Sequence, residues 1–243
     1  AGESIDRVAG GGARPDVTGA VGREGRSWTG RAAGATLARD DAPSAHGGPM
    51  HARELRQRTG FRVLGLDDGP FTRTGSPDVL VVGPVLRGSG QLDGLLSTTI
   101  TRDGFDATER LTEMIVASKF LPQLHYILLG GVTVGGFNVV DLPALAAATG
   151  RGVLAVTRRP PDLVRMHAAT EALPDPPRRR ALLQRAGPVL RLAGLCCQLH
   201  GLEPDQATAV LEITCQHGRF PEPLRLAHLI AGGLVRGQST GRA

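Results

Sequence analysis

Apolar residues are distributed unevenly along the chain, and the division falls near residue 60. Residues 1–60 hold one aromatic residue, Trp28, and almost no run of consecutive apolar side chains. Such a segment cannot bury enough apolar surface to offset the entropy lost on ordering. From Phe61 onward the chain is dense in Val, Leu and Ile, and it is long enough to enclose a sizeable core. We therefore predict a disordered tail over residues 1–60, with a short helix near 51–59, and one folded domain over residues 61–243.

The first apolar run of the folded part ends abruptly in two carboxylates. The run Phe61–Leu66 is followed by Asp67, Asp68 and a Gly-Pro pair. This pattern is typical of a buried strand that delivers acids to the edge of a sheet. Because successive side chains of a strand alternate, Asp67 and Asp68 are expected to point to opposite faces, so that at most one enters a given site. The alternative is a simple turn, in which an Asp side chain bonds its own backbone.

Two further strands and then a series of helices and strands are predicted. Residues 79–86 and 92–101 are rich in β-branched residues, and Pro84 indicates an edge position or a bulge. At the start of the first helix, Asp106 is expected to be the N-cap, with Glu109 as its capping-box partner. The elements predicted next are helix 106–117, strand 125–129, helix 141–149, strand 152–157, helical segments 162–173 and 177–186, a final strand 189–199, and helices 204–215 and 221–235.

This order of elements favours one α/β fold class. Three antiparallel strands followed by βαβ units give a mixed sheet with helices on both faces. The later strands are expected to run parallel to their neighbours through right-handed crossovers. This is the ribonuclease H-like arrangement, in which ligands bind at the carboxyl ends of the strands. Asp67 would lie at the end of the central first strand.

Composition and charge narrow the functional classes only slightly. The formal net charge is +5, but Lys119 is the only lysine and the arginines are dispersed, so the high pI is weak support for a nucleic-acid partner. The three cysteines, Cys196, Cys197 and Cys215, form no Cys-x-x-Cys motif and indicate a reducing compartment. The nearby histidines are not spaced as in a common zinc site. Without an apolar stretch of about 18 residues or a signal-like start, we expect a soluble, cytoplasmic protein with no membrane partner.

Several longer motifs, taken together, resemble one family. They are Leu64-Gly-Leu-Asp-Asp-Gly-Pro-Phe71, the strand 92–101, Asp106-Ala-Thr-Glu-Arg110, Gly135-Gly-Phe-Asn-Val-Val-Asp141, and residues 221–231 with the terminal Gly241-Arg-Ala243. In this order they resemble an uncharacterised protein family that is related to endonuclease V and best known from archaea. The resemblance covers essentially everything after the tail. It implies a metal-dependent phosphodiesterase that uses Mg²⁺ or Mn²⁺ and acts on nucleic acid, either DNA or RNA.

The resemblance also implies roles for particular residues. Endonuclease V-like proteins use carboxylates from the first and fourth strands, a third acid near the end of the third strand, and a late helical Arg-x-x-His. Asp67 matches the first-strand acid, and Asp103 is the nearest third-strand candidate, with Asp106 behind it. Arg225 and His228 match the Arg-x-x-His. The implied metal ligands are Asp67, Asp103 and Asp106, and the implied catalytic residues are Asp67, Arg225 and His228.

The chain departs from the family pattern at the fourth strand. The family has an apolar strand followed by Asp-Gly there, whereas this chain has Gly130 in the place of the acid. Glycine supplies no oxygen ligand, so metal binding is expected to weaken. Asp68 and Asp141 are the acids that could substitute. Two alternative functions follow: a catalytically inactive nucleic-acid- or nucleotide-binding protein of the same fold, or a protein-interaction scaffold with vestigial acids.

Each implied site residue also has a purely structural interpretation. Asp103 and Asp106 are well placed for a turn and a helix N-cap. His228 lies between apolar residues on a helix and could be a core histidine. Arg225 could form an ion pair with Glu222 one turn away.

Overall fold

The computed structural model describes residues 53, 55, 60–88, 90–216 and 218–239. The tail predicted over residues 1–60 and the helix predicted near 51–59 lie almost entirely outside these residues, although residues 53 and 55 are helical. Leu55 is fully buried, in the same apolar cluster as Phe61. The core therefore includes a residue on the N-terminal side of the boundary expected at residue 61.

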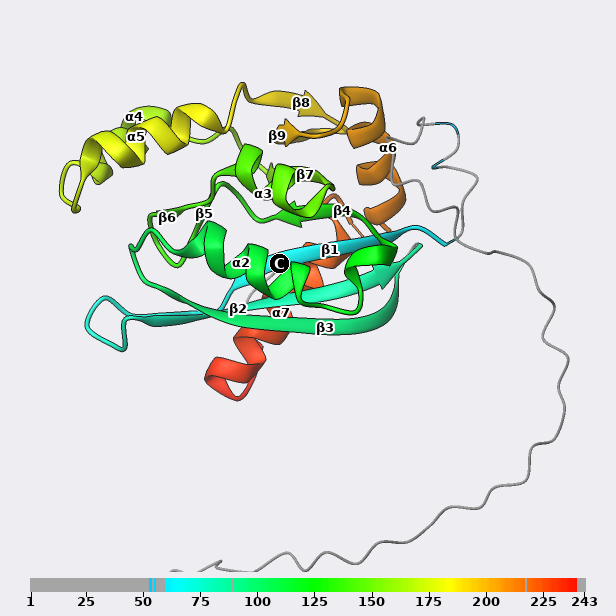
Figure 1. Ribbon diagram of the computed structural model, residues 1–243, viewed down its shortest axis with the longest axis horizontal. Helices are drawn as coiled ribbons and strands as arrows, with labels where there is room; N and C mark the ends of the chain where they lie inside the picture. The colour runs from blue at the N-terminus through cyan, green and yellow to red at the C-terminus, as the bar shows by residue number, and fades with distance from the viewer. Residues whose placement is uncertain (1–52, 54, 56–59, 89, 217, 240–243) are drawn as a thin grey trace, which may run out of the picture. The chain divides into compact units, whose positions relative to one another are not determined.

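A seven-stranded mixed sheet lies at the centre of the fold (Figure 1). Its strands are β1 (Arg62–Asp68), β2 (Asp78–Arg87), β3 (Gln91–Thr101), β4 (Leu124–Leu129), β7 (Gly152–Thr157), β8 (Leu190–Leu192) and β9 (Leu195–His200). In space they follow the order β3-β2-β1-β4-β7-β9-β8. The first three strands form an antiparallel meander, and β4 and β7 extend the sheet from β1 in parallel. The predicted ribonuclease H-like mixed sheet with an antiparallel start is thus confirmed.

The last part of the sheet differs from the prediction. The expected single strand 189–199 is a hairpin of β8 and β9, which reverses at Ala193 and Gly194, both with positive φ. A two-residue turn with positive φ at both positions closes a tight hairpin. As a result β9 runs antiparallel to β7, whereas a parallel neighbour was expected. The strand that follows the crossover, β8, does run in the direction of β7, but β9 folds back and takes the place beside it.

Helices cover both faces of the sheet. They are α2 (Ala107–Val116), α3 (Leu142–Thr149), α4 (Leu163–Thr170), α5 (Pro176–Arg185), α6 (Pro204–Thr214) and α7 (Glu222–Arg236), with a 3₁₀ helix η1 (Leu121–Gln123) and a small ribbon of β5 (Thr133–Val134) and β6 (Asn138–Val139). Buried residues of α2, α3 and α5 join Leu64 and Leu66 in one cluster, and those of α6 and α7 join Val63 in another. None of the helices described is long and apolar enough to cross a membrane.

Pro84 lies in an interior strand, not at an edge. β2 pairs with β1 on one side and with β3 on the other, so the predicted edge position is wrong. The predicted bulge is confirmed, because the register between β2 and β3 shifts between Val85 and Leu86. Displaced pairing next to the proline accommodates a residue that has no backbone N–H to donate.

The close contact between β1 and α7 places the last helix over the first strand. A Cβ atom added at Gly65 would lie 2.3 Å from the carbonyl carbon of Pro223. No real side chain tolerates that separation, so glycine is required for this approach. Because α7 then continues along β1, the middle of the helix reaches the carboxyl end of the strand.

Candidate active site

The structure brings Asp67 and His228 together at the carboxyl end of β1. His228 Nδ1 lies 3.0 Å from Asp67 Oδ2, although the two residues are 161 positions apart in the chain. Odd-numbered side chains of β1 face α7, which is why Asp67 and not Asp68 meets the helix. The Asp67 side chain is 22% exposed and that of His228 is 45% exposed. The pair is therefore reachable from solvent and yet partly screened from it.

The charge of Asp67 depends on two opposing influences. Burial raises the pKa of its carboxyl group, while the hydrogen bond and the positive charge of His228 act to lower it. Burial is the larger effect, and the pKa of Asp67 stays above its usual value. With Nδ1 of His228 engaged by the carboxylate, Nε2 is the ring nitrogen left to exchange a proton with a ligand.

Asp68 lies on the opposite face of the sheet, as alternation predicts. It is the last residue of β1 and pairs with Val81, and its carboxylate accepts a hydrogen bond from its own backbone N–H, which is the contact that the turn alternative describes. Its carboxylate accepts a hydrogen bond from the backbone N–H of Gly135. Burial, together with the negative charge of Asp67, raises the pKa of Asp68 to about 6. The two carboxylates therefore influence each other through their charges while their side chains lie on opposite faces of the sheet.

Gly130 lies directly beside Asp67. It follows β4, the parallel neighbour of β1, and a Cβ atom added there would lie 3.1 Å from Asp67 Oδ1. A side chain at this position would therefore contact the carboxylate that the resemblance implies as a metal ligand. With glycine at this position, no second acid lies beside Asp67 Oδ1.

Asp103 has a structural role in the turn after β3. Its backbone is left-handed, with φ of 53°, and its Oδ1 accepts a hydrogen bond from Phe137 N at 2.8 Å. Its own N–H donates to Gly135 O at 2.9 Å. The carbonyl groups of Asp103 and Phe137 both accept hydrogen bonds from Arg179, which is fully buried. Asp103 thus fastens the β5–β6 ribbon to the end of β3.

Asp106 does not cap its helix with its side chain, although it holds the N-cap position. Its carboxylate accepts hydrogen bonds from Thr101 and from Asn138 Nδ2, the latter at 2.6 Å. Asn138 Oδ1 in turn accepts from the N–H of Ala107 at 3.1 Å. The predicted capping box with Glu109 is therefore wrong, because Asn138 takes the capping role. Burial acts to raise the pKa of Asp106, but the hydrogen bonds from Asn138 and Thr101 lower it.

Arg225 forms an ion pair with Glu222, in line with the structural interpretation. Arg225 Nε lies 2.7 Å and Nη2 2.5 Å from the two Glu222 oxygens, which is a bidentate contact. The Glu222 side chain is 10% exposed and that of Arg225 is 38% exposed. The guanidinium is therefore held in one orientation, while part of it remains accessible.

The three acids implied as metal ligands are not brought together. Within the described residues, no three His, Cys, Asp or Glu side chains form a group that could hold a metal ion. Asp103 and Asp106 are engaged in the hydrogen bonds given above, which leaves Asp67 as the available oxygen ligand. Mg²⁺ keeps several waters and is often held by one or two carboxylates together with substrate phosphates. The donor set suits an ion that binds jointly with a substrate, and not a resident ion in a closed cage.

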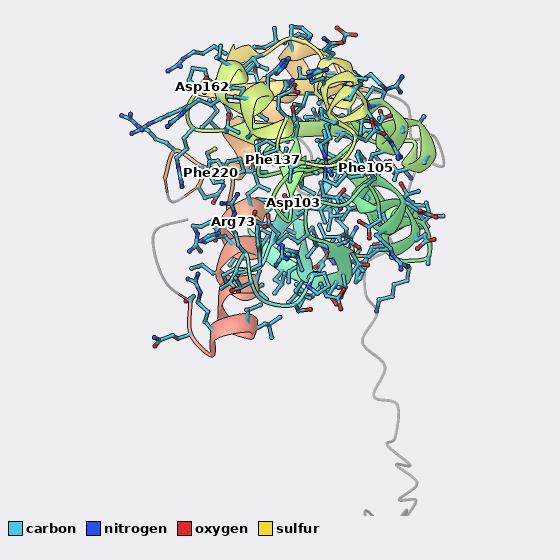
Figure 2. All side chains as sticks on the ribbon, turned by 90° about the vertical axis from the view of Figure 1, so that its left-hand side faces the viewer. Arg73, Asp103, Phe105, Phe137, Asp162 and Phe220 are labelled. Atoms are coloured by element: carbon cyan, nitrogen blue, oxygen red, sulfur yellow. The ribbon has the colours of Figure 1, made fainter. Side chains whose placement is uncertain are left out.

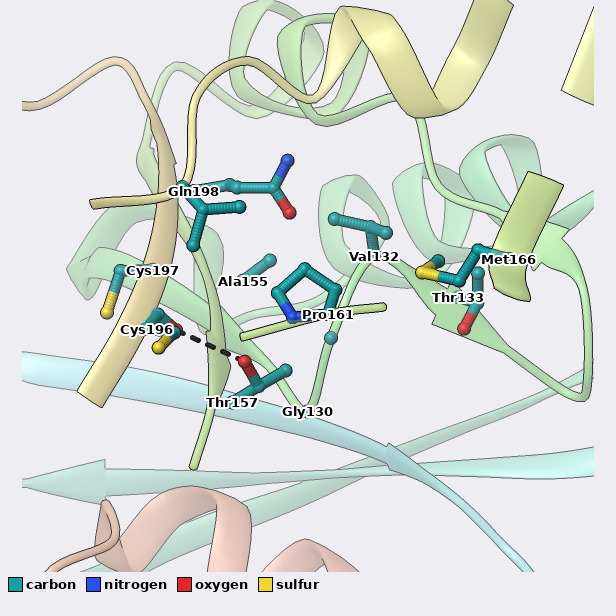
Figure 3. Close-up of a pocket in the computed structure, with 12 residues that line it drawn as sticks. Gly130, Val132, Thr133, Ala155, Thr157, Pro161, Met166, Cys196, Cys197 and Gln198 are labelled. Carbon is teal, nitrogen blue, oxygen red and sulfur yellow. Dashed lines mark hydrogen bonds between the residues drawn. The ribbon is translucent and has the colours of Figure 1, made fainter. Parts of the chain in front are cut away.

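A cavity that sequence reasoning missed opens beside Gly130, at the carboxyl ends of β4 and β7 and the start of β9 (Figure 3). Its volume is about 150 Å³. Apolar side chains supply most of the wall, and Thr157 and Gln198 add polar groups. The sequence gives one hint of it: a Gly-Gly pair, Gly130-Gly131, follows β4, and a Pro-Pro pair, Pro160-Pro161, follows shortly after β7. The main lining residues are Gly130, Val132, Ala155, Thr157, Pro161, Met166 and Gln198.

Comparison with known sequences identifies the family. Residues 59–235 match a family model described as Endonuclease dU. A UPF0215 protein of Methanothermobacter thermautotrophicus is 44% identical over 199 residues, which cover 80% of this chain and 98% of that protein. A UPF0215 protein of Deinococcus radiodurans is 43% identical over 181 residues, covering 74% and 92%.

Solved structures agree with the fold. A protein of unknown function from Archaeoglobus fulgidus is 36% identical and superposes with a TM-score of 0.68, covering 72% of this chain and 98% of that one. Endonuclease V from Bacillus subtilis superposes with a TM-score of 0.50 at 11% identity, covering 78% and 84%, and this likeness concerns the fold alone. The resemblance to an uncharacterised family related to endonuclease V is thus confirmed. With about three quarters of its length matched by the family model, the chain belongs to the Endonuclease dU family.

Proposed function

We propose that this protein is an endonuclease that hydrolyses a phosphodiester bond of nucleic acid with Mg²⁺ or Mn²⁺, in a strand that carries an altered base. The observation that supports this most directly is the Asp67–His228 pair, with a contact of 3.0 Å. Gly130, where an added Cβ atom would lie 3.1 Å from Asp67 Oδ1, also lines the cavity. The nuclease-like function follows from family membership. The metal dependence and the altered base are the parts that we add.

The proposed roles divide between the two oxygens of Asp67. Oδ2 orients the His228 ring through Nδ1, so that Nε2 can take a proton from the attacking water or give one to the leaving oxygen. Oδ1, which faces Gly130, would hold the ion together with a substrate phosphate. A bound ion supplies charge stabilisation to the oxygens of the in-line displacement. Arg225 uses two donors on Glu222 and has others for a phosphate oxygen.

The cavity supports the recognition of a single base. Its volume of about 150 Å³ corresponds to on the order of five water molecules. Gln198 Nε2 donates to Gly187 O at 2.8 Å, which leaves the Gln198 amide oxygen as an acceptor at the cavity (Figure 3). An acceptor there would suit the ring N–H of uracil or hypoxanthine. Because the family name specifies dU, deoxyuridine is the first altered base to test, with inosine as the comparison.

Cleavage of labelled DNA and RNA, single-stranded and duplex, tests the proposal. Strands with one deoxyuridine or one inosine are incubated with the full chain and Mg²⁺ or Mn²⁺, and cleavage is expected to stop in Asp67→Asn. Asp205→Asn is the matched control, because Asp205 lies in the first turn of α6 and contributes no group to the site. Cleavage that survives Asp67→Asn, or no cleavage of any strand, would refute the proposal.

A lapsed enzyme is the second candidate, and Gly130 is the observation that favours it. In that case the protein binds nucleic acid without cutting it. Gly130 has no positive φ, so an aspartate can be introduced there without backbone strain. Cleavage gained by Gly130→Asp but absent in the wild type would establish this candidate, and Gly130→Asn would show whether the carboxylate is responsible.

A further inference from the structure

Among the described residues, nine arginines are neutralised by an acid or bound to carbonyl groups. This pattern holds at the amino edge of the sheet and on the outer helices. Each of these ion pairs joins an arginine to a carboxylate within hydrogen-bonding range. The pairs are Arg62 and Arg87 with Asp93, Arg110 with Glu113, Arg180 with Glu171, Arg185 with Asp141, and Arg225 with Glu222.

Several arginines near the carboxyl edge, Arg73 among them, depart from this pattern, and four of them lie on two segments that a side-chain contact joins. Arg158 and Arg159 directly follow β7, Arg165 lies in the first turn of α4, and Arg219 precedes α7. All four are exposed. In the part of the chain that the structure describes, the side chains of Arg159, Arg165 and Arg219 have no ion pair, hydrogen bond or ring contact. We call these four residues the arginine cluster.

A cation–π contact joins the two segments that carry the cluster. The Arg158 guanidinium lies 4.3 Å from the centre of the Phe220 ring, although the residues are far apart in the chain. This contact brings Arg219, next to Phe220, towards Arg158 and Arg159. Within residues 158–166 and 218–221 the only acid is Asp162, whose Oδ1 is already engaged by the backbone N–H of Arg165 at 3.0 Å. The cluster is therefore a local excess of positive charge.

The cluster adjoins the candidate active site. Thr157, the residue before Arg158, lines the cavity at Gly130. Phe220 lies two residues before the start of α7, which carries His228. Figure 2 looks onto the side of the molecule where β1 ends, and it shows Phe220, Arg73 and Asp103 on this same face. An arginine-rich rim next to a phosphodiesterase site suits the sugar–phosphate backbone, because the guanidinium fork matches phosphate oxygens.

We propose that the arginine cluster binds phosphates of a nucleic-acid strand whose neighbouring phosphodiester bond lies at Asp67. The contact is independent of sequence, since it involves no base edge. Unpaired arginines that neutralise phosphates release condensed counterions, so they set the salt dependence of binding. This inference rests on the proposed function for its substrate class, but it concerns binding and can be tested without cleavage.

The test measures the affinity of the full-length Asp67→Asn protein for fluorescein-labelled single-stranded and duplex DNA by anisotropy, at several salt concentrations. The slope of log K against log salt is negative, and each lost phosphate contact reduces its magnitude by roughly 0.7 on a single strand and 0.9 on a duplex. The double variant Arg159→Ala/Arg219→Ala is therefore expected to reduce the magnitude of the slope by roughly 1.4 on a single strand and by roughly 1.8 on a duplex. Arg110→Ala with Arg180→Ala removes the same charge from ion-paired positions and is expected to leave the slope unchanged.

The outcomes separate this inference from the proposed function. A slope that does not change in Arg159→Ala/Arg219→Ala, with an unaltered melting temperature, would overturn the cluster even if the wild type cleaves DNA. If the wild type cleaves no strand but Arg159→Ala/Arg219→Ala shows a smaller salt dependence of binding, the phosphate-binding role of the cluster is supported although the proposed function fails. Poly-glutamate is the comparison polyanion: if the variant loses affinity for it but not for DNA, the cluster serves an acidic protein and the inference is wrong.

Discussion

The adjacent carboxylates of Asp67 and Asp68, at the end of β1, lie in different surroundings and make different contacts. Asp67 meets His228 on the face of α7, whereas Asp68 meets the backbone of Gly135 on the face of α2. The two charges nevertheless repel, and this repulsion adds to burial in raising the pKa of Asp68 to about 6. Asp67 therefore contacts the histidine of α7, whereas Asp68 contacts the loop that contains Gly135.

The raised pKa of Asp68 predicts a specific dependence of stability on pH. The folded protein keeps this proton up to about pH 6, whereas the unfolded chain releases it near 3.8, so the folded state binds more protons between these values. Stability is therefore lost as pH rises through this window, by at most about 3 kcal/mol. In EDTA, the melting temperature of Asp68→Asn should exceed that of the wild type above this window and converge with it near the lower limit. An advantage of the wild type that grows with pH would contradict this assignment.

At the scale of elements, the packing of α7 on β1 controls the geometry of the site. The helix approaches the strand through Gly65, where even one methyl group would overlap Pro223. The same helix presents His228 to Asp67. A change at Gly65 should thus disturb the pair without touching either member.

Gly65→Ala is expected to destabilise the fold and weaken the site together. Overpacking of this kind costs about 1–3 kcal/mol, and the displaced helix would move His228 away from Asp67. Urea unfolding measures the first effect, and the NMR signal of the His228 Nδ1 proton in the hydrogen bond to Asp67 measures the second. Gly60→Ala is the matched control, because a Cβ atom there meets nothing within 4 Å. A Gly65→Ala protein with wild-type stability would show that the helix does not lie this close to the strand.

The elements were predictable to the extent that they depend on local pattern. The alternation in β1 correctly assigned Asp67 and Asp68 to opposite faces, whereas the resemblance implied roles for Asp67 and His228 without predicting the contact between them. The role of Asn138 was not predictable, because it caps α2 and binds Asp106 from 32 positions away. The β8–β9 hairpin was missed because Ala193, with its positive φ, carries no turn signal in its residue type.

At the scale of the whole molecule, charge is sorted by position although it is dispersed along the sequence. Arginines are ion-paired at the amino edge and at several positions of the outer helices, while the arginine cluster has no ion pair with any described residue. Net charge and pI contain no information on this sorting. It becomes visible only when residues 158–166 and 218–221 are placed together by the contact of Arg158 with Phe220.

The extent of the folded unit gives a whole-molecule prediction. Leu55 is fully buried with Phe61, so a chain that starts at residue 61 loses a core side chain. We expect deletion of residues 1–60 to lower the melting temperature and deletion of residues 1–52 to leave it nearly unchanged. Leu55→Ala in the full chain should reproduce the loss, at about 2–5 kcal/mol in chemical unfolding. Equal stability of the two deletions would place Leu55 outside the core.

The pairing of the first strand with the last helix has a consequence for synthesis. Asp67 leaves the ribosome before His228, and 161 positions separate the two residues. A chain interrupted anywhere before α7 holds the carboxylate without its histidine. If the proposed function is correct, products truncated before α7 are harmless to nucleic acid, and nuclease activity appears only after α7 has been made.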